Sequence, residues 1–268
     1  MSGAKVSATT VASLTLPSVP ERVCLSCGRS LEGRRRHAKT CSGTCRQRLH
    51  AARRKASTWS EQRAVEWGLE ARDFWRTPPA LFAALDALVG PFGLDAATAG
   101  EADAHCARFL TPDDDALTTC WATASGGRPV FVNPPYSRRG GRGLGLLAWV
   151  RAAVRARDAG VVVAMVLPSA RGTAWARLLR EEAPVVLHPA GELARAGRVA
   201  FIHPDSGLAI RQNRGEAMVP ILRPDERGPP MEPDWTGNES WVPTGQGHVF
   251  RPRARLAMAS ASTQEVST

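Results

Sequence analysis

The sequence predicts an α/β fold, a three-layer sandwich in which helices cover both faces of a sheet, preceded by a small cysteine-rich module. Between residues 72 and 223, short apolar runs alternate with segments whose apolar residues recur at helical spacing. Residues 161–167 form a continuous apolar run, typical of a strand buried on both faces of a parallel sheet. Strands that alternate with helices indicate such layered sheets. Four of the six cysteines lie ahead of this region, within residues 24–45, which sets them apart as a module.

The elements of the sandwich follow one another along the chain. Thr77 and Pro78 suit a helix start, because Thr is a good N-cap and Pro is tolerated at the first helical position. Apolar residues follow at helical spacing up to Gly90. Further helices are expected over residues 144–157 and 173–182. Strands are expected at residues 92–95, 129–132, 161–167 and 185–187, and two late strands at residues 199–202 and 217–222, which a hairpin would pair.

Composition divides the chain into five parts. Residues 1–22 are expected to be a disordered leader, because they lack the compact apolar block of a secretory signal. Residues 23–55 are the basic cysteine module, and residues 56–71 are a linker for which a helix is an option. Residues 72–223 are the main domain. Residues 224–268, rich in Pro, Gly, Ser and Thr, are expected to be a mostly disordered tail.

The positive charge of the chain is concentrated in the cysteine module. Residues 24–55 contain ten Lys or Arg side chains and one acid, Glu32, which accounts for nearly all of the net charge of +10. Such a localised basic segment is typical of a protein that binds nucleic acid; a solvated tail is the alternative. No apolar run reaches the roughly 18–20 residues that span a bilayer. We therefore expect a cytoplasmic protein that binds DNA and no membrane, and assign no oligomeric state.

The spacing of the first four cysteines predicts a metal site. Cys24 and Cys27 form one close pair, Cys41 and Cys45 form another, and thirteen residues separate the pairs. Two such pairs can hold one structural zinc ion between four thiolates. A module this small has little core, so metal binding would supply its folding energy. Binding DNA is its expected task, with a protein–protein contact as the alternative.

The motif Asn133-Pro134-Pro135-Tyr136, directly after an expected strand, carries the strongest chemical signal. Proline keeps its carbonyl but has no N–H, so the turn presents hydrogen-bond acceptors with few competing donors. The amine of adenine or cytosine is a poor nucleophile, because its lone pair is delocalised into the ring. Acceptors at the Asn133 side chain and the Pro134 carbonyl would free that lone pair, and Tyr136 offers a face for stacking. The motif thus predicts methyl transfer to a planar amine.

Together with its surroundings the motif resembles the phage-type DNA N6-adenine methyltransferases, over about residues 72–203. The resemblance depends on an ordered series of matches: Asp73-Phe74-Trp75-Arg76-Thr77-Pro78, Phe92-Gly93-Leu94-Asp95-Ala96-Ala97, His105 to Thr111, Asp113 to Leu117, Asn133 to Tyr136, and Gly197 to Phe201. It implies a Rossmann-like class I methyltransferase fold and a bacterial cell as location, with a phage or prophage as a source. The glycine-rich loop usual in methyltransferases is replaced here by alanines, Ala96 and Ala97.

The resemblance also implies the cofactor, S-adenosylmethionine (AdoMet). Thr77 and Pro78 would lie by its methionine end, Asp95 and Ala96 beneath it, and Asp115 near its adenosine. The expected function is AdoMet-dependent methylation of the N6 amine of adenine in DNA. The first alternative is an N4-cytosine DNA methyltransferase, because the acceptors serve either amine. The second is a non-catalytic zinc-containing DNA-binding protein with a decayed methyltransferase domain.

Overall fold

The computed structural model describes residues 22–252 apart from residues 36, 56–57, 139, 141–143, 211–214, 228–229 and 245–246. The disorder expected for the leader and for the end of the tail therefore falls outside the described residues. Among the described helices, none combines the length and the apolar character that crossing a membrane requires.

A seven-stranded sheet forms the centre of the main domain. The order across the sheet is β1 (Leu94–Asp95), β2 (Val130–Val132), β3 (Val163–Met165), β6 (Ala217–Leu222), β5 (Val185–Pro189) and β7 (Asp234–Trp235). The short strand β4 (Leu167–Pro168) follows β3 and also pairs with β6. Strands β1, β2 and β3 run parallel, whereas β6 is antiparallel to both β3 and β5.

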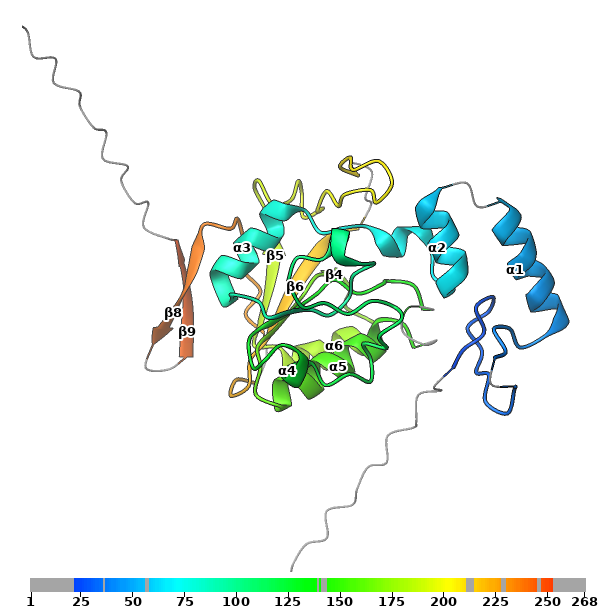
Figure 1. Cartoon of the computed structure of the whole chain (residues 1–268). Coiled ribbons are helices and arrows are strands. Elements are labelled where there is room, and N and C mark those ends of the chain that lie inside the picture. The colour runs from blue at the N-terminus through cyan, green and yellow to red at the C-terminus, as the bar shows by residue number, and fades with distance from the viewer. Residues whose placement is uncertain are drawn as a thin grey trace, which may run out of the picture.

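Helices cover both faces of this sheet, as the sequence predicts. In β2, Val130 and Val132 belong to a core cluster shared with α4 (Trp121–Ala124), α5 (Leu146–Asp158) and α6 (Ala174–Glu182). Phe131, between them, faces the opposite cluster, which includes α3 (Pro79–Val89). This alternation follows from the two-residue period of a strand. Figure 1 shows α3 on one side of the sheet and α4, α5 and α6 on the other. The fold is a three-layer α/β sandwich.

The start of α3 differs from the prediction. Its N-cap is Pro78, which gives no side-chain cap, and Pro79 is the first helical residue. Proline supplies the helical φ and has no N–H to leave unbonded, so the helix begins without a capping side chain. Thr77 is therefore not the N-cap; it is 3% exposed and lies beside the cavity described below.

The expected hairpin of residues 199–202 and 217–222 does not form. Strand β6 lies between β3 and β5, so both of its edges are already paired. Val199 and Phe201 are buried in the cluster that contains α3, rather than in the sheet. Ile202 makes single bridges with Arg76 and Ala209. The apolar character of this segment reflects burial against a helix layer, which periodicity alone does not distinguish from a buried strand.

The prediction of a mostly disordered segment from residue 224 is wrong for its first part. Strand β7 pairs in parallel with β5, and Trp235 is fully buried. Strands β8 (Glu239–Thr244) and β9 (Gly247–Pro252) then form an antiparallel hairpin, seen apart from the sandwich in Figure 1. The composition of the whole segment is polar, but burying one tryptophan contributes roughly 1.5–3 kcal/mol or more, enough to order a short strand.

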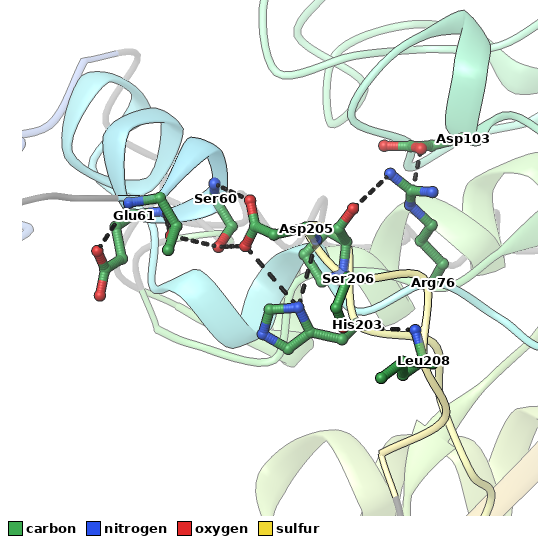
Figure 2. A network of polar contacts seen from close by, with 10 residues as sticks. Ser60, Glu61, Arg76, Asp103, His203, Asp205, Ser206 and Leu208 are labelled. Carbon is green, nitrogen blue, oxygen red and sulfur yellow. Dashed lines mark hydrogen bonds and ion pairs between the residues drawn. The ribbon is translucent and has the colours of Figure 1, made fainter.

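Two helices precede the sandwich. Helix α1 (Gly43–Lys55) contains Cys45, the last of the four module cysteines, and α2 (Trp59–Trp67) occupies the region expected as a linker. Thr58 and Glu61 form a capping box at the start of α2. The Ser60 backbone N–H donates to the Asp205 carboxylate at 2.9 Å, and the Ser60 hydroxyl donates to its other oxygen. Figure 2 shows this network, which fastens α2 to the main domain.

Candidate active site

The motif Asn133 to Tyr136 lies at the edge of the sheet where the parallel strands end, and ligands bind at this edge in open α/β folds. Asn133 follows β2, and Asp95 ends the neighbouring parallel strand β1. A cavity of about 560 Å³ opens at this edge. Of the predicted site residues, the structure brings six to the wall of the cavity: Thr77, Asp95, Ala96, Asp115, Asn133 and Pro135.

The side chain of Asn133 is held in one orientation. Its Nδ2 donates to the Trp75 carbonyl at 3.3 Å, which identifies the other side-chain atom as the Oδ1 acceptor. The Tyr136 hydroxyl lies 3.2 Å from Asn133 Oδ1 and 3.1 Å from the Val166 carbonyl, and it has one proton for these two acceptors. An amide oxygen has two lone pairs, so Asn133 Oδ1 retains acceptor capacity for a substrate N–H.

Two residues of the motif, Pro134 and Tyr136, are not among the residues that line the large cavity. The Tyr136 ring packs at the junction of the two core clusters and meets Phe201 edge to face, with centroids 6.4 Å apart. Burial raises the pKa of the Tyr136 hydroxyl, so it stays protonated and can donate. A crevice of about 20 Å³ is lined by both residues together with Trp75, Asn133 and Phe201. Stacking of a base on Tyr136 stays a prediction.

Asp73 ties the motif to the segment that carries Trp75. Its Oδ1 accepts from the Ser137 backbone N–H at 2.9 Å, and its Oδ2 accepts from the Glu70 N–H at 2.9 Å. The same carboxylate therefore fixes both the residue after the motif and the start of the short 3₁₀ helix η1 (Ala71–Phe74). This bridge keeps the Trp75 carbonyl within reach of Asn133.

Asp95 is a buried carboxylate that lines the cavity. It is 2% exposed, and its oxygens accept from the backbone N–H groups of Ala97 at 3.3 Å and His105 at 3.1 Å. Burial raises its pKa to about 6, above the ordinary value of 3.8. A buried acid beside a cavity is typical of a functional site.

Other residues that line the cavity also fit a polar ligand. Among the described residues, Thr77 Oγ1 is buried without a hydrogen-bond partner, so a ligand at the cavity wall would satisfy it. Asp115, which also lines the cavity, adopts a φ of +48°, a left-handed conformation that is uncommon for non-glycine residues. Pro78 caps α3 instead of lining the cavity. The polar groups of Thr77, Asp95 and Asp115 and the volume of the cavity fit AdoMet, although alanines replace the usual glycine-rich loop.

The four cysteines of the N-terminal module form one cluster. Their Sγ atoms all lie within 4.8 Å of one another. Cys41 Sγ lies 3.5 Å from Cys27 Sγ and 3.6 Å from Cys45 Sγ. A disulfide would bring two sulfurs to about 2.05 Å, so these are free thiols. Four thiolates around zinc at about 2.3 Å each lie roughly 3.8 Å apart, close to these separations. The cluster fits a zinc ion.

Sequence reasoning assigned no role in the site to Trp75 or to Asp73. The Trp75 contribution is a backbone carbonyl, which no residue type can signal. Asp73 lies in a segment that the resemblance had already marked, and its place 64 residues before Ser137 gave no sign of their contact.

The sheet order, the acceptor-rich turn after β2 and the cavity beside it define a Rossmann-like class I methyltransferase. The model of the DNA N-6-adenine-methyltransferase (Dam) family matches residues 66–233, so the chain belongs to this family. The match begins after the cysteine module, which is therefore an addition to the family domain.

Two curated relatives agree with this assignment. The chain is 30% identical over 166 residues to the DNA N-6-adenine-methyltransferase of Escherichia phage T1, covering 59% of this chain and 65% of that protein. It is 42% identical over 69 residues to the putative methyltransferase YfdM of Escherichia coli (strain K12), covering 25% of this chain and 75% of that protein. The chain thus spans just under two thirds of the phage protein. No solved structure matches it.

Proposed function

We propose that this protein transfers a methyl group from AdoMet to the N6 amine of adenine in DNA. The observation that carries the proposal is the fixed amide of Asn133 at the wall of a cavity large enough for a cofactor. Family membership supports adenine as the base, and the phage T1 relative carries the same activity in its name. The place of action would be the cytoplasm of a bacterial cell, where DNA and AdoMet occur together.

The reaction needs acceptors and positioning more than an added base. AdoMet, when bound, supplies a methyl group on a positively charged sulfur, which keeps the bonding electron pair when the methyl leaves. Asn133 Oδ1 and the Pro134 carbonyl accept hydrogen bonds from the two amine hydrogens, so the nitrogen lone pair is directed at the methyl carbon. The same acceptors stabilise positive charge as it develops on nitrogen. One amine proton then leaves to water.

The cofactor would occupy the Asp95 end of the cavity. Thr77 Oγ1 would gain a partner, and the Asp95 carboxylate would attract a cofactor that carries net positive charge. Ala96 and Asp115 line the same cavity. Pro78 would act only through the placement of α3.

The cysteine module would hold structural zinc and contact DNA phosphates. Its four thiols have the spacing that a tetrahedral site requires, and its basic residues suit a polyanion. Transfer to an amine inside a duplex requires that the base leave the stack, so we infer that the target base flips out.

A direct assay tests the proposed function. The protein is incubated with AdoMet labelled on the methyl group and with unmethylated DNA, and the DNA is then digested to nucleosides. We expect the label in N6-methyladenine. Label in N4-methylcytosine would select the first alternative, because the acceptor pair serves both amines. A protein that binds DNA and transfers no label would select the decayed, non-catalytic alternative.

The buried Asp95 gives the proposal a pH signature. Its folded pKa of about 6 lies above the ordinary 3.8, so its contribution to folding stability falls as pH rises from about 4 to 6. AdoMet affinity should change in the opposite direction, because only the ionised carboxylate attracts the sulfonium. We expect AdoMet to bind about tenfold more weakly at pH 5 than at pH 8, by calorimetric titration. Asp95→Asn should bind weakly at both pH values; a wild-type affinity independent of pH would exclude this role.

A further inference from the structure

The cysteine module forms one wall of the cavity that contains the catalytic motif. Residues from the N-terminal segment, far from Asn133 and Pro135 in sequence, line the same cavity as these two residues. The module is therefore part of the site rather than a separate tether. The module contributes Val23, Leu25, Leu31, Ala38 and Lys39 to the lining of the cavity, and the preceding residue, Arg22, also lines it.

Direct contacts connect this wall to the catalytic turn. Gly68, at the left-handed C-cap of α2, packs so closely on Leu25 that a Cβ there would lie 2.8 Å from Leu25 Cδ2. The next residue, Leu69, reaches Gly140, where an added Cβ would lie 3.4 Å from Leu69 Cδ2 and would overlap Pro135. Module, α2 and motif are thus packed in series, and the module lies at the Pro135 end of the cavity.

Arg22 and Lys39 are the positively charged side chains of the N-terminal segment that line the cavity, and of the two only Lys39 is exposed. Its segment is held in place, because the Arg22 guanidinium donates to the carbonyls of Arg35 at 2.9 Å and Ala38 at 3.1 Å. The Lys39 carbonyl accepts from the Leu25 N–H at 2.9 Å, which ties it to the residue that packs on Gly68. The Lys39 side chain is itself exposed. A cation on a fixed loop at a cavity rim is placed to receive an anion.

We propose that Lys39 holds a backbone phosphate of the DNA strand whose base occupies the catalytic cavity. This inference rests on the proposed function, since it assumes that DNA enters at the Pro135 end. AdoMet carries a net positive charge at neutral pH and gains no net attraction from Lys39, whereas each DNA phosphate carries a full negative charge. The phosphate contact fixes the strand while the base stays beside Asn133, and it makes the cysteine module part of the substrate site.

Three variants of the full chain test the proposal by equilibrium binding to fluorescent duplex DNA with AdoMet present. Lys39→Gln should weaken DNA binding about tenfold, the loss of one charge-assisted hydrogen bond. Lys39→Arg should stay within about twofold of the wild type, because it keeps the charge. Arg34→Gln removes the same charge from an exposed position of the module outside the cavity wall, and should weaken binding less than about threefold.

Two results would overturn the proposal. One is a Lys39→Gln variant that binds DNA as the Arg34→Gln variant does. The other is a Lys39→Gln variant whose AdoMet affinity without DNA falls about tenfold, which would assign Lys39 to the cofactor carboxylate. Methyl transfer by the wild type, measured on the same samples, tests the proposed function separately. DNA binding that depends on Lys39, without any methyl transfer, would support the phosphate contact and contradict the proposed enzymatic activity.

Discussion

Replacing Asn133 by Ala is expected to lower the rate of methyl transfer to DNA by about 10²–10³-fold, the usual cost of removing one hydrogen-bonding group that stabilises a transition state. The Asn133 side chain is the acceptor whose orientation the structure fixes, through its bond to the Trp75 carbonyl. Without it, the target amine keeps its lone pair in the ring. Single-turnover transfer from labelled AdoMet measures the loss in the chemical step.

Two controls separate this effect from damage to the fold. Asn133→Ala should bind AdoMet and DNA within about threefold of the wild type, because the acceptor acts mainly as charge develops. Asn133→Asp keeps an acceptor oxygen but places a carboxylate against the Trp75 carbonyl. It should fall between the wild type and Asn133→Ala. Equal transfer rates for Asn133→Ala and the wild type would exclude Asn133 as the catalytic acceptor.

Replacing both Cys24 and Cys27 by Ser is expected to abolish zinc binding and to unfold the cysteine module. Structural zinc sites contribute on the order of 10 kcal/mol to the folding of small domains, and the buried apolar core of this module consists of Leu31 with Cys24 and Cys45. The wild type should contain one zinc per chain by elemental analysis, and the variant none. Limited proteolysis should then cut the variant within residues 23–55, while the sandwich stays intact.

A matched control is available in the same chain. Cys120 is an exposed cysteine outside the cluster, so Cys120→Ser should keep the full zinc content and the protease resistance of the wild type. Because the module forms a wall of the catalytic cavity, the double variant should also bind DNA more weakly than the control. A double variant that keeps one zinc per chain would contradict the four-cysteine site.

Much of the fold was predictable because its signals are local. Helices α5 and α6 begin and end within two residues of the expected ranges, and the run after residue 161 is the buried strand β3 with β4. Two of the errors have a different cause. Val199 and Phe201 are buried against a helix layer instead of pairing as a strand. Strand β7 is ordered because it pairs with β5 and buries Trp235. Both depend on partners distant in sequence.

The candidate site divides in the same way. The identities of Asn133, Asp95 and Thr77 were readable, since each lies in a short motif at the end of a predicted strand or the start of a helix. The support of Asn133 by Trp75 and the bridge through Asp73 were not. Trp75 acts through its backbone carbonyl, and Asp73 contacts Ser137, which lies 64 residues later in the sequence.

The sequence by itself determined the chemistry available to this protein. Acceptors without competing donors follow from the residue types of Asn133, Pro134 and Pro135, and a four-sulfur site follows from the spacing of two cysteine pairs. Only the tertiary structure decided where these groups meet. It turned the Asn133 amide toward the Trp75 carbonyl, and it placed the cysteine module, with Lys39, at the wall of the same cavity. The physical reason is that residue identity fixes hydrogen-bonding capacity, whereas orientation and proximity come from packing between distant segments.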